Sequence, residues 1–224
     1  MILEAKGLTK EFGSGEAGVV ALREVSFRAA EGEFVAITGP SGSGKSTLLA
    51  LLAGLERPSS GEVWVNGRPL SGLDDAELSR MRRRELGFVF QTFNLVPVLT
   101  LEENVALPFL LDGRARAAWS AEVTAALEAV GLAHRRTHLP DQVSVGERQR
   151  AAIARALAQR PRILFADEPT GSLDSQRGAA TLQLLRLATG NGCTVVMVTH
   201  DPVGAASADR AVHLRDGAVE DPPC

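Results

Sequence analysis

Residues 34–52 read FVAITGPSGSGKSTLLALL, in which an apolar run, a loop of glycine and serine, and a second apolar run follow one another. This pattern predicts a strand, a glycine-rich loop and a helix, in that order. The loop matches the spacing G-x-x-x-x-G-K-[ST], which indicates a phosphate-binding loop when a strand precedes it and a helix follows it. We therefore expect a phosphate site at residues 39–47. The alternative is an ordinary Gly/Ser loop that happens to contain a lysine.

The residue types in this loop suit a polyphosphate. Glycines let the backbone curl tightly enough for successive N–H groups to point at phosphate oxygens. Lys45 supplies a positive charge for the β and γ phosphates, and Ser46 offers a hydroxyl group to Mg²⁺. The helix that follows adds its positive N-terminal end.

Composition limits the class of protein. With 224 residues the chain can form one large α/β domain or a domain with an inserted lobe. A net charge of −3 gives no global basic field, so we expect no nucleic-acid partner. Cys193 and Cys224 form no disulfide framework or metal spacing, which fits a reducing compartment. No apolar run approaches the ~20 residues of a membrane span, and the first residues lack an export signal. We expect a cytosolic protein that can act at a membrane only through another chain.

Periodicity and turn signals predict a strand-helix core with an inserted helical lobe. No strand pattern appears between Thr92 and Arg160. We expect strands at residues 2–5, 19–27, 34–37, 61–65, 86–90, 163–166 and 194–198, with a last hairpin at 210–214 and 218–219. We expect helices directly after the phosphate loop and at residues 74–84, 100–111, 120–130, 144–158 and 175–188.

Three of the predicted strands end in polar residues, namely Gln91, Asp167-Glu168 and His200. Ligands of open α/β sheets sit beyond the carboxyl ends of the strands, so one site can gather these residues with the phosphate loop. Asp167 is placed to hold Mg²⁺, and Glu168 to orient or deprotonate the attacking water. A pair of solvated loop acids is the alternative for the two carboxylates. His200 is better placed to reach a γ-phosphate than the other histidines, although a lone histidine is more often structural. Gln91 alone is a weak signal.

Two further features have alternative interpretations. Phe12 precedes a Gly-rich turn at residues 13–18 and could stack on a flat base, or it could be a core residue at a strand end. The basic cluster Arg80, Arg82, Arg83 and Arg84 is typical of a solvated helix face, with phosphate or partner contact as the alternative.

Taken together, these motifs resemble the ATP-binding subunits of ABC (ATP-binding cassette) transporters over nearly the whole chain. Gly39 to Thr47 matches the Walker A loop, Ile163 to Glu168 the Walker B strand, and Gly171 to Asp174 the D-loop. Phe12, Gln91 and His200 match the adenine-stacking aromatic, the Q-loop and the switch histidine. The resemblance implies an α/β P-loop NTPase fold with a RecA-like core, a mostly parallel sheet, a small antiparallel β-subdomain and an inserted helical subdomain. It implies a single domain with the core at residues 1–91 and 161–224 and the helical subdomain at residues 92–160.

The signature motif departs from the family pattern Leu-Ser-Gly-Gly-Gln, because residues 143–147 read VSVGE. Ser144 and the Gly146 N–H can still donate to a γ-phosphate from a helix N-terminus. Val145 is harmless if its φ is negative, whereas φ > 0 would cost roughly 1–3 kcal/mol. Glu147 suits the helix dipole and completes a capping box. We expect a working but slower site; a chain that only binds ATP is the alternative.

The resemblance implies a homodimer in which two copies sandwich ATP and Mg²⁺. The residues implied as catalytic are Glu168, His200, Gln91 and Lys45, and those implied to hold Mg²⁺ are Ser46, Gln91 and Asp167. Ser144 and Gly146 of the second copy would close over the γ-phosphate. The other residues implied to bind ATP are Phe12, Gly39, Pro40, Ser41, Gly42, Ser43, Gly44, Lys45, Ser46, Thr47, Gln91 and Asp167.

Within the family, residues 87–97, 99–105 and 146–150 are closest to one branch. It holds the ATPases of lipoprotein-releasing and macrolide-exporting systems (LolD and MacB types) and the cell-division ATPase FtsE. This implies an ATP hydrolase on the cytoplasmic face of the membrane that powers a separate permease for export or extraction. The alternative is FtsE-like signalling across the membrane without cargo. A soluble cassette of DNA repair or translation would need a long coiled coil or tandem cassettes, and the chain has neither.

Overall fold

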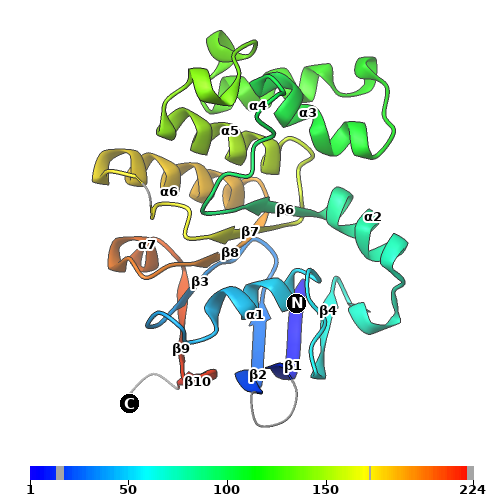
Figure 1. Cartoon of the computed structure of the whole chain (residues 1–224), viewed down its shortest axis with the longest axis vertical. Coiled ribbons are helices and arrows are strands. Elements are labelled where there is room, and N and C mark those ends of the chain that lie inside the picture. The colour runs from blue at the N-terminus through cyan, green and yellow to red at the C-terminus, as the bar shows by residue number, and fades with distance from the viewer. Residues whose placement is uncertain (14–17, 172, 221–224) are drawn as a thin grey trace.

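The computed structural model describes residues 1–13, 18–171 and 173–220, and its strands form two sheets (Figure 1). The larger sheet has six strands in the order β10-β9-β3-β8-β7-β6. All neighbours in it pair in parallel except β10, which pairs antiparallel with β9. Its strands are β3 (Phe34–Thr38), β6 (Leu86–Val89), β7 (Ile163–Asp167), β8 (Thr194–Val198), β9 (Arg210–Arg215) and β10 (Ala218–Glu220).

The central strands are mostly apolar because both faces of this sheet are buried. In β3, Val35 and Ile37 join one buried cluster while Phe34 and Ala36 join another. The same alternation places Ile163 and Phe165 of β7 on the first side. The predicted buried strands are therefore confirmed, and each one contributes to two cores.

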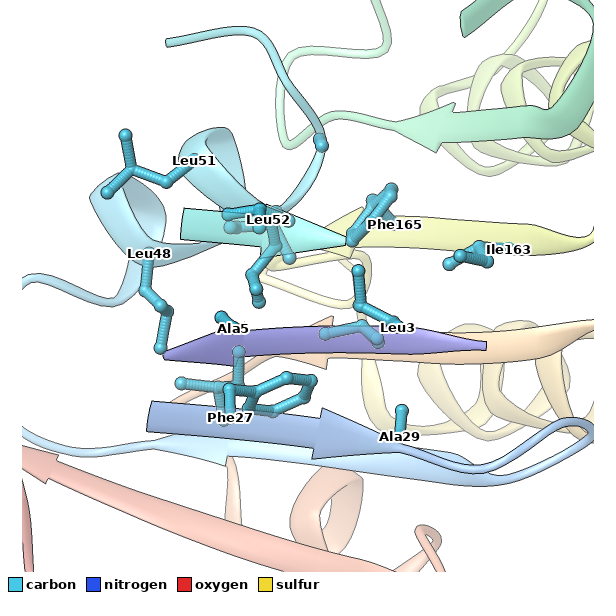
Figure 2. Close-up of a cluster of buried hydrophobic side chains, with 14 of the residues drawn as sticks. Leu3, Ala5, Phe27, Ala29, Leu48, Leu51, Leu52, Ile163 and Phe165 are labelled. Carbon is cyan, nitrogen blue, oxygen red and sulfur yellow. The ribbon is translucent and has the colours of Figure 1, made fainter. Parts of the chain in front are cut away.

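The first core lies between the large sheet and a four-stranded antiparallel sheet (Figure 2). The close-up shows Leu3 and Phe27 from the small sheet gathered with Leu52 of the first helix and Phe165 of β7. The small sheet has the order β2 (Val19–Ala29), β1 (Leu3–Phe12), β4 (Ser60–Val65) and β5 (Arg68–Pro69).

The predicted end of the first strand at Ala5 is wrong, because β1 continues to Phe12. A register shift follows Ala5, where Gly7 has a φ of 57°. Lys6 and Gly7 interrupt the apolar pattern, yet pairing with β2 on one side and β4 on the other carries the strand past this irregularity. Of the turn predicted at residues 13–18, residues 14–17 lie outside the described part of the chain.

The helices fall into two groups. Around the sheets lie α1 (Lys45–Leu52), α2 (Asp75–Glu85), α6 (Ser175–Gly190) and α7 (Pro202–Ala206). Residues 92–160, all of which the structure describes, contain no strand, as predicted. They form α3 (Leu101–Leu111), α4 (Ser120–Ala129) and α5 (Val145–Leu157), which stack at one end of the molecule (Figure 1). The five-residue α7 was not predicted, and neither were the 3₁₀ turns η2 (Leu70–Gly72), η3 (Arg116–Ala118), η4 (Ala133–Arg135) and η5 (Pro140–Gln142).

Helix α5 is buried on two sides. Ile153 and Ala156 pack with β7 and α6, while Ala151, Ala154 and Ala158 pack with α3 and α4. Small side chains on both sides let the helix fit between two layers, which explains its high alanine content. It joins the helical layer to the core.

The basic cluster on α2 serves intramolecular contacts. Arg82 donates to the Gly54 carbonyl at 2.7 Å, and Arg84 donates to both carboxylate oxygens of Asp112 at 3.0 and 3.1 Å. Because Asp112 follows α3, these bonds tie α2 to the helical layer. These two arginines therefore do not form a merely solvated face.

Cys193 is not a candidate nucleophile. Cys193 is buried, and burial raises the pKa of its thiol to about 12. Cys224 lies outside the described residues. Within the described residues, no helix combines the length and apolar composition needed to cross a bilayer.

Asn104 organises the loop that leads into α3. Its side chain is fully buried, accepts from the Val96 N–H at 2.7 Å, and donates to the carbonyls of Val96, Leu99 and Thr100 at 3.1, 2.9 and 3.0 Å. Since buried polar groups are costly when unpaired, this one side chain fixes the whole loop.

We expect Asn104→Ala to lower the free energy of unfolding by about 2–3 kcal/mol, because it leaves buried loop groups without partners. Urea denaturation measures this loss. Glu103→Ala is the control, since it removes an exposed cap on the same helix and should cost about 1 kcal/mol. Equal losses in the two variants would contradict the role of Asn104.

Candidate nucleotide site

The glycine-rich loop joins β3 to α1 as predicted, with a conformation that depends on glycine. Gly39, Gly42 and Gly44 have φ values of 142°, 80° and 97°. A Cβ on Gly39 would lie 2.0 Å from the Leu214 carbonyl oxygen, and one on Gly44 would lie 2.5 Å from that of Ala21. The loop is therefore packed against the neighbouring strands β9 and β2 while Pro40, Ser41 and Gly42 remain exposed.

Lys45 is held inside this loop. The residue is only 8% exposed, and its ammonium donates to the carbonyls of Gly39 and Pro40 at 2.9 and 2.7 Å. These bonds keep a positive charge under the exposed turn of the loop. Ser43 is also buried, and its hydroxyl oxygen has no hydrogen-bond partner among the described residues.

Ser46 and Asp167 meet although they are far apart in the sequence. The Ser46 hydroxyl donates to Asp167 Oδ1 at 3.1 Å. Burial, followed by the negative charge of Glu168, raises the pKa of Asp167, while the Ser46 hydrogen bond and Lys45 oppose this rise. A bound cation would favour the charged form of Asp167, which burial disfavours. The Asp167 carboxylate and the Ser46 hydroxyl offer the oxygen ligands that a hard cation such as Mg²⁺ prefers.

Glu168 and His200 form a second contact at the same edge. The two side chains meet at 2.8 Å through Glu168 Oε1 and His200 Nδ1. The other carboxylate oxygen of Glu168 is buried and has no hydrogen-bond partner within the described residues. The backbone of Glu168 has a φ of 46°, an uncommon conformation for a residue with a side chain, which is often found at functional sites.

Gln91 and Phe12 lie at the ends of their own strands. Gln91 follows β6, is exposed, and has its side-chain nitrogen 3.6 Å from the ideal Cβ position of Gly171. Gln91 therefore adjoins the turn that follows Glu168.

Phe12 is 44% exposed at the end of β1, with the Lys10 ammonium 4.9 Å from its ring centroid. Such exposure rules out the alternative of a plain core residue.

Ser144 and Gly146 begin α5, on the opposite side of the large sheet from α1. Ser144 and Glu147 form the predicted capping box, with the Glu147 N–H donating to Ser144 Oγ at 3.3 Å. In return, the Ser144 N–H and hydroxyl donate to Glu147 Oε2 at 2.9 and 2.8 Å, and these two bonds, with help from Arg135, lower the pKa of Glu147. Val145 lies in the first helical turn and is not among the residues with positive φ, so it carries none of the strain considered above. No described contact joins Ser144 or Gly146 to the phosphate loop of the same chain.

Other residues at the site were not identified from the sequence. Gln149 is fully buried and donates to the Pro169 carbonyl at 2.8 Å, and Arg155 donates to the Phe93 carbonyl at 2.8 Å. Arg177 lies 3.1 Å from the position a Gly146 Cβ would take. For Gln149, the only signal in the sequence is a polar residue within an otherwise apolar helix face, and Arg177 has no signal in the sequence. Ser172 of the predicted D-loop lies outside the described residues.

Comparison with known proteins identifies the family. Residues 22–171 match the family model described as ABC transporter. The chain is 42% identical to the lipoprotein-releasing system ATP-binding protein LolD of Shewanella oneidensis, over 99% of this chain and 97% of that protein. It is 45% identical to the macrolide export ATP-binding/permease protein MacB of Marinobacter nauticus, over 98% of this chain and 34% of that protein.

A solved structure gives the same answer for the fold. The ATP-binding cassette MJ0796 of Methanocaldococcus jannaschii, a dimer in a post-hydrolysis state bound to ADP and Pi, superimposes with a TM-score of 0.90. The match has 43% identity and covers 98% of this chain and 97% of that one. The fold predicted from the resemblance is confirmed, and the chain belongs to the ABC transporter family as an ATP-hydrolysing cassette.

Proposed function

We propose that this chain hydrolyses ATP as one half of a homodimer and powers a separate membrane permease that exports or extracts cargo. The observation that carries the proposal is the convergence of the Ser46–Asp167 and Glu168–His200 contacts beside the glycine-rich loop. The names of LolD and MacB support export or extraction over signalling without cargo. The permease would hold the chain on the cytoplasmic face of the membrane.

The triphosphate would lie along the loop from Gly39 to Thr47, with its charge met by Lys45 and the N-terminus of α1. Phe12 would stack on the adenine, which its exposed ring permits. Catalysis at such a site consists mostly of positioning and charge stabilisation of the phosphoryl group in transfer.

The Ser46 and Asp167 oxygens would hold Mg²⁺, and Gln91 would be a third ligand. The described residues contain no group of three or more acidic, histidine or cysteine side chains suited to a metal. Mg²⁺ does not need one, because it commonly keeps waters and takes phosphate oxygens alongside one or two protein groups. When bound, the ion neutralises charge that develops on the phosphate oxygens.

Glu168 would orient the attacking water and accept its proton. Its buried and unpaired Oε2 can receive a proton, while the contact with His200 fixes the position of Oε1. His200 and Lys45 would then donate to the γ-phosphate.

A second copy would complete the site with Ser144 and Gly146. These residues lie across the sheet from the phosphate loop of their own chain, which supports supply in trans. The MJ0796 cassette, to which this chain is similar, was solved as a dimer. Two helix N-termini would thus close over two nucleotides.

The boundaries proposed for the core are residues 1–91 and 161–224, with the helical subdomain at 92–160. One observation supports them: a separate apolar cluster draws its buried side chains from residues 101–158. Between this subdomain and α2 lies a groove of about 350 Å³ whose lining includes Leu55, Phe90, Asn94 and Leu111.

We propose this groove as the docking site for a cytoplasmic segment of the permease with apolar anchor residues. Leu55 and Leu111 are 47% and 63% exposed there. Phe90 and Asn94 flank Gln91, so the groove adjoins the nucleotide site. A larger cavity of about 770 Å³ lies between α4, α5 and α6, but it reaches the amino ends of β7 and β8, at the opposite edge of the sheet. Coupling between ATP hydrolysis and the permease needs physical contact between the docking site and the nucleotide site. The groove beside Gln91 meets this condition, and the larger cavity does not.

We expect Glu168→Gln to retain ATP binding, to lower ATP turnover by at least about a hundredfold, and to accumulate an ATP-bound dimer. The reason is that glutamine keeps the shape of the side chain but cannot accept the proton. Phosphate release and sedimentation velocity with ATP measure the two effects. Normal turnover by this variant would reject Glu168 as the base.

We expect Asp167→Asn to raise the melting temperature of the nucleotide-free protein at neutral pH, because it removes a carboxylate whose charge burial disfavours. Because the pKa of Asp167 is higher in the folded than in the unfolded chain, ionising this carboxyl lowers the free energy of unfolding of the wild type. This loss is complete above the pKa of the folded state, and it disappears as pH falls to the pKa of the unfolded state. The gain should therefore shrink on acidification. The same variant should lose the stabilisation that Mg-ATP gives the wild type, as thermal denaturation with and without Mg-ATP would reveal. A variant that is still stabilised by Mg-ATP would refute the assignment of Asp167 to the ion.

We expect Leu111→Glu to abolish co-purification of the permease from detergent-solubilised membranes while leaving the ATPase activity of the isolated chain intact. A charge in the groove would oppose an apolar anchor. Leu187→Glu is the matched control, because Leu187 is 65% exposed and lines the larger cavity. Loss of the same membrane protein with Leu187→Glu, and its retention with Leu111→Glu, would move the docking site to the other cavity.

A further inference from the structure

Arg155 makes an unusual contact with the loop that follows Gln91. Its guanidinium group donates through Nη2 to the Phe93 carbonyl at 2.8 Å and through Nη1 to the Asn94 carbonyl. Phe93 and Asn94 have φ values of 61° and 49°, so both are in the left-handed region. For a phenylalanine this conformation is disfavoured, and a fixed pair of donors on the two carbonyls holds it in place.

The charge of Arg155 has no acidic partner. Among the described residues it makes no ion pair, and burial lowers the pKa of its guanidinium. The Phe93 and Asn94 carbonyls are therefore its hydrogen-bond partners in place of a carboxylate. Arg148, about two turns earlier in α5, has its guanidinium 5.9 Å from the Phe93 ring centroid and contacts the same loop residue. Two arginines of α5 therefore act on the segment directly after the Q-loop glutamine.

The other end of α5 carries the signature residues. From Ser144 to Arg155 the helix spans about 17 Å, given a rise of ~1.5 Å per residue. Both long sides of α5 are packed, so it moves as a rigid element. A displacement of the Phe93 loop would therefore reach Ser144 and Gly146 through the helix.

We propose that Arg155 is a positioning residue that fixes the loop after Gln91 to α5, so that nucleotide bound at one site sets the position of the lid over the other. The inference rests on the proposed homodimer with a shared site. In this dimer each α5 connects the Q-loop of its own chain to the γ-phosphate held by the partner. Arg155 also lines the groove proposed for the permease, together with Asn94. A permease segment bound in that groove would therefore touch the Arg155–Asn94 contact directly.

The test compares Arg155→Ala, Arg155→Lys and Arg150→Ala in the full-length chain. Arg150 lies on the same helix, and its side chain makes no hydrogen bond or ion pair with the described residues, so its variant is the matched control. ATP hydrolysis is measured against ATP concentration, nucleotide affinity by equilibrium binding to the monomer, and folding by melting temperature.

For Arg155→Ala we expect the Hill coefficient to fall from about 2 toward about 1, because the two sites lose their connection. The turnover number should fall roughly tenfold to a hundredfold, as a misplaced lid would cause, while nucleotide affinity of the monomer is retained. Arg155→Lys keeps the charge but lacks the fork of donors, so it should lie between the alanine variant and the wild type. If Arg155→Ala does not fold, the same measurements on Arg155→Lys decide the matter.

A purely structural role would lower the melting temperature and the amount of active protein without changing the Hill coefficient. An unchanged Hill coefficient in both Arg155 variants, or an equal change in Arg150→Ala, overturns the proposal. Failure of the proposed function is a separate result, because it would appear in the wild type as non-cooperative hydrolysis or as the absence of an ATP-dependent dimer.

Discussion

Parallel pairing in register is the constraint on which the candidate site depends. Ile37 of β3 pairs with Val198 of β8, Val198 with Asp167 of β7, and Ala166 with Val89 of β6. Because the strands are parallel, the residues that follow them emerge at one edge and at one level. A shift of β7 by one residue would move Asp167 away from Ser46 and turn Phe165 out of the first core. The packing of the cores and the geometry of the site are therefore fixed together.

The same edge concentrates features that do not help the fold. The charge of Asp167 is disfavoured by burial, Glu168 has a left-handed backbone, and one Glu168 carboxylate oxygen and the Ser43 hydroxyl have no described partner. Each is costly in an isolated protein, and each is the kind of group that a bound nucleotide and its cation can satisfy. Their occurrence together at the carboxyl ends of β3 and β7 argues for binding there more strongly than any one residue does.

The sequence was informative where local chemistry decides the structure. Two-faced burial makes β7 and β8 mostly apolar, and glycines in the left-handed region make the loop at residues 39–47 recognisable. The sequence was silent where long-range pairing decides. The extension of β1 to Phe12 depends on its two neighbouring strands, and the partners of Arg82 and Arg84 lie 28 residues away in each case. The effect of Val145 depended on a single backbone angle, which only the structure could supply.

The position of α5 relative to the site is set by directional polar contacts as well as by apolar packing. Alanine side chains present a smooth surface that fits several neighbouring positions, whereas hydrogen bonds are directional and fit one. In the described part of the chain, α5 side chains donate to the loops that follow two strands of the sheet: Gln149 to Pro169, after Glu168, and Arg155 to Phe93, after Gln91. One helix therefore contacts the loop that follows Glu168 and the loop that follows Gln91. In the coupling proposed above, a change at either loop would reach the N-terminus of α5, where Ser144 and Gly146 lie.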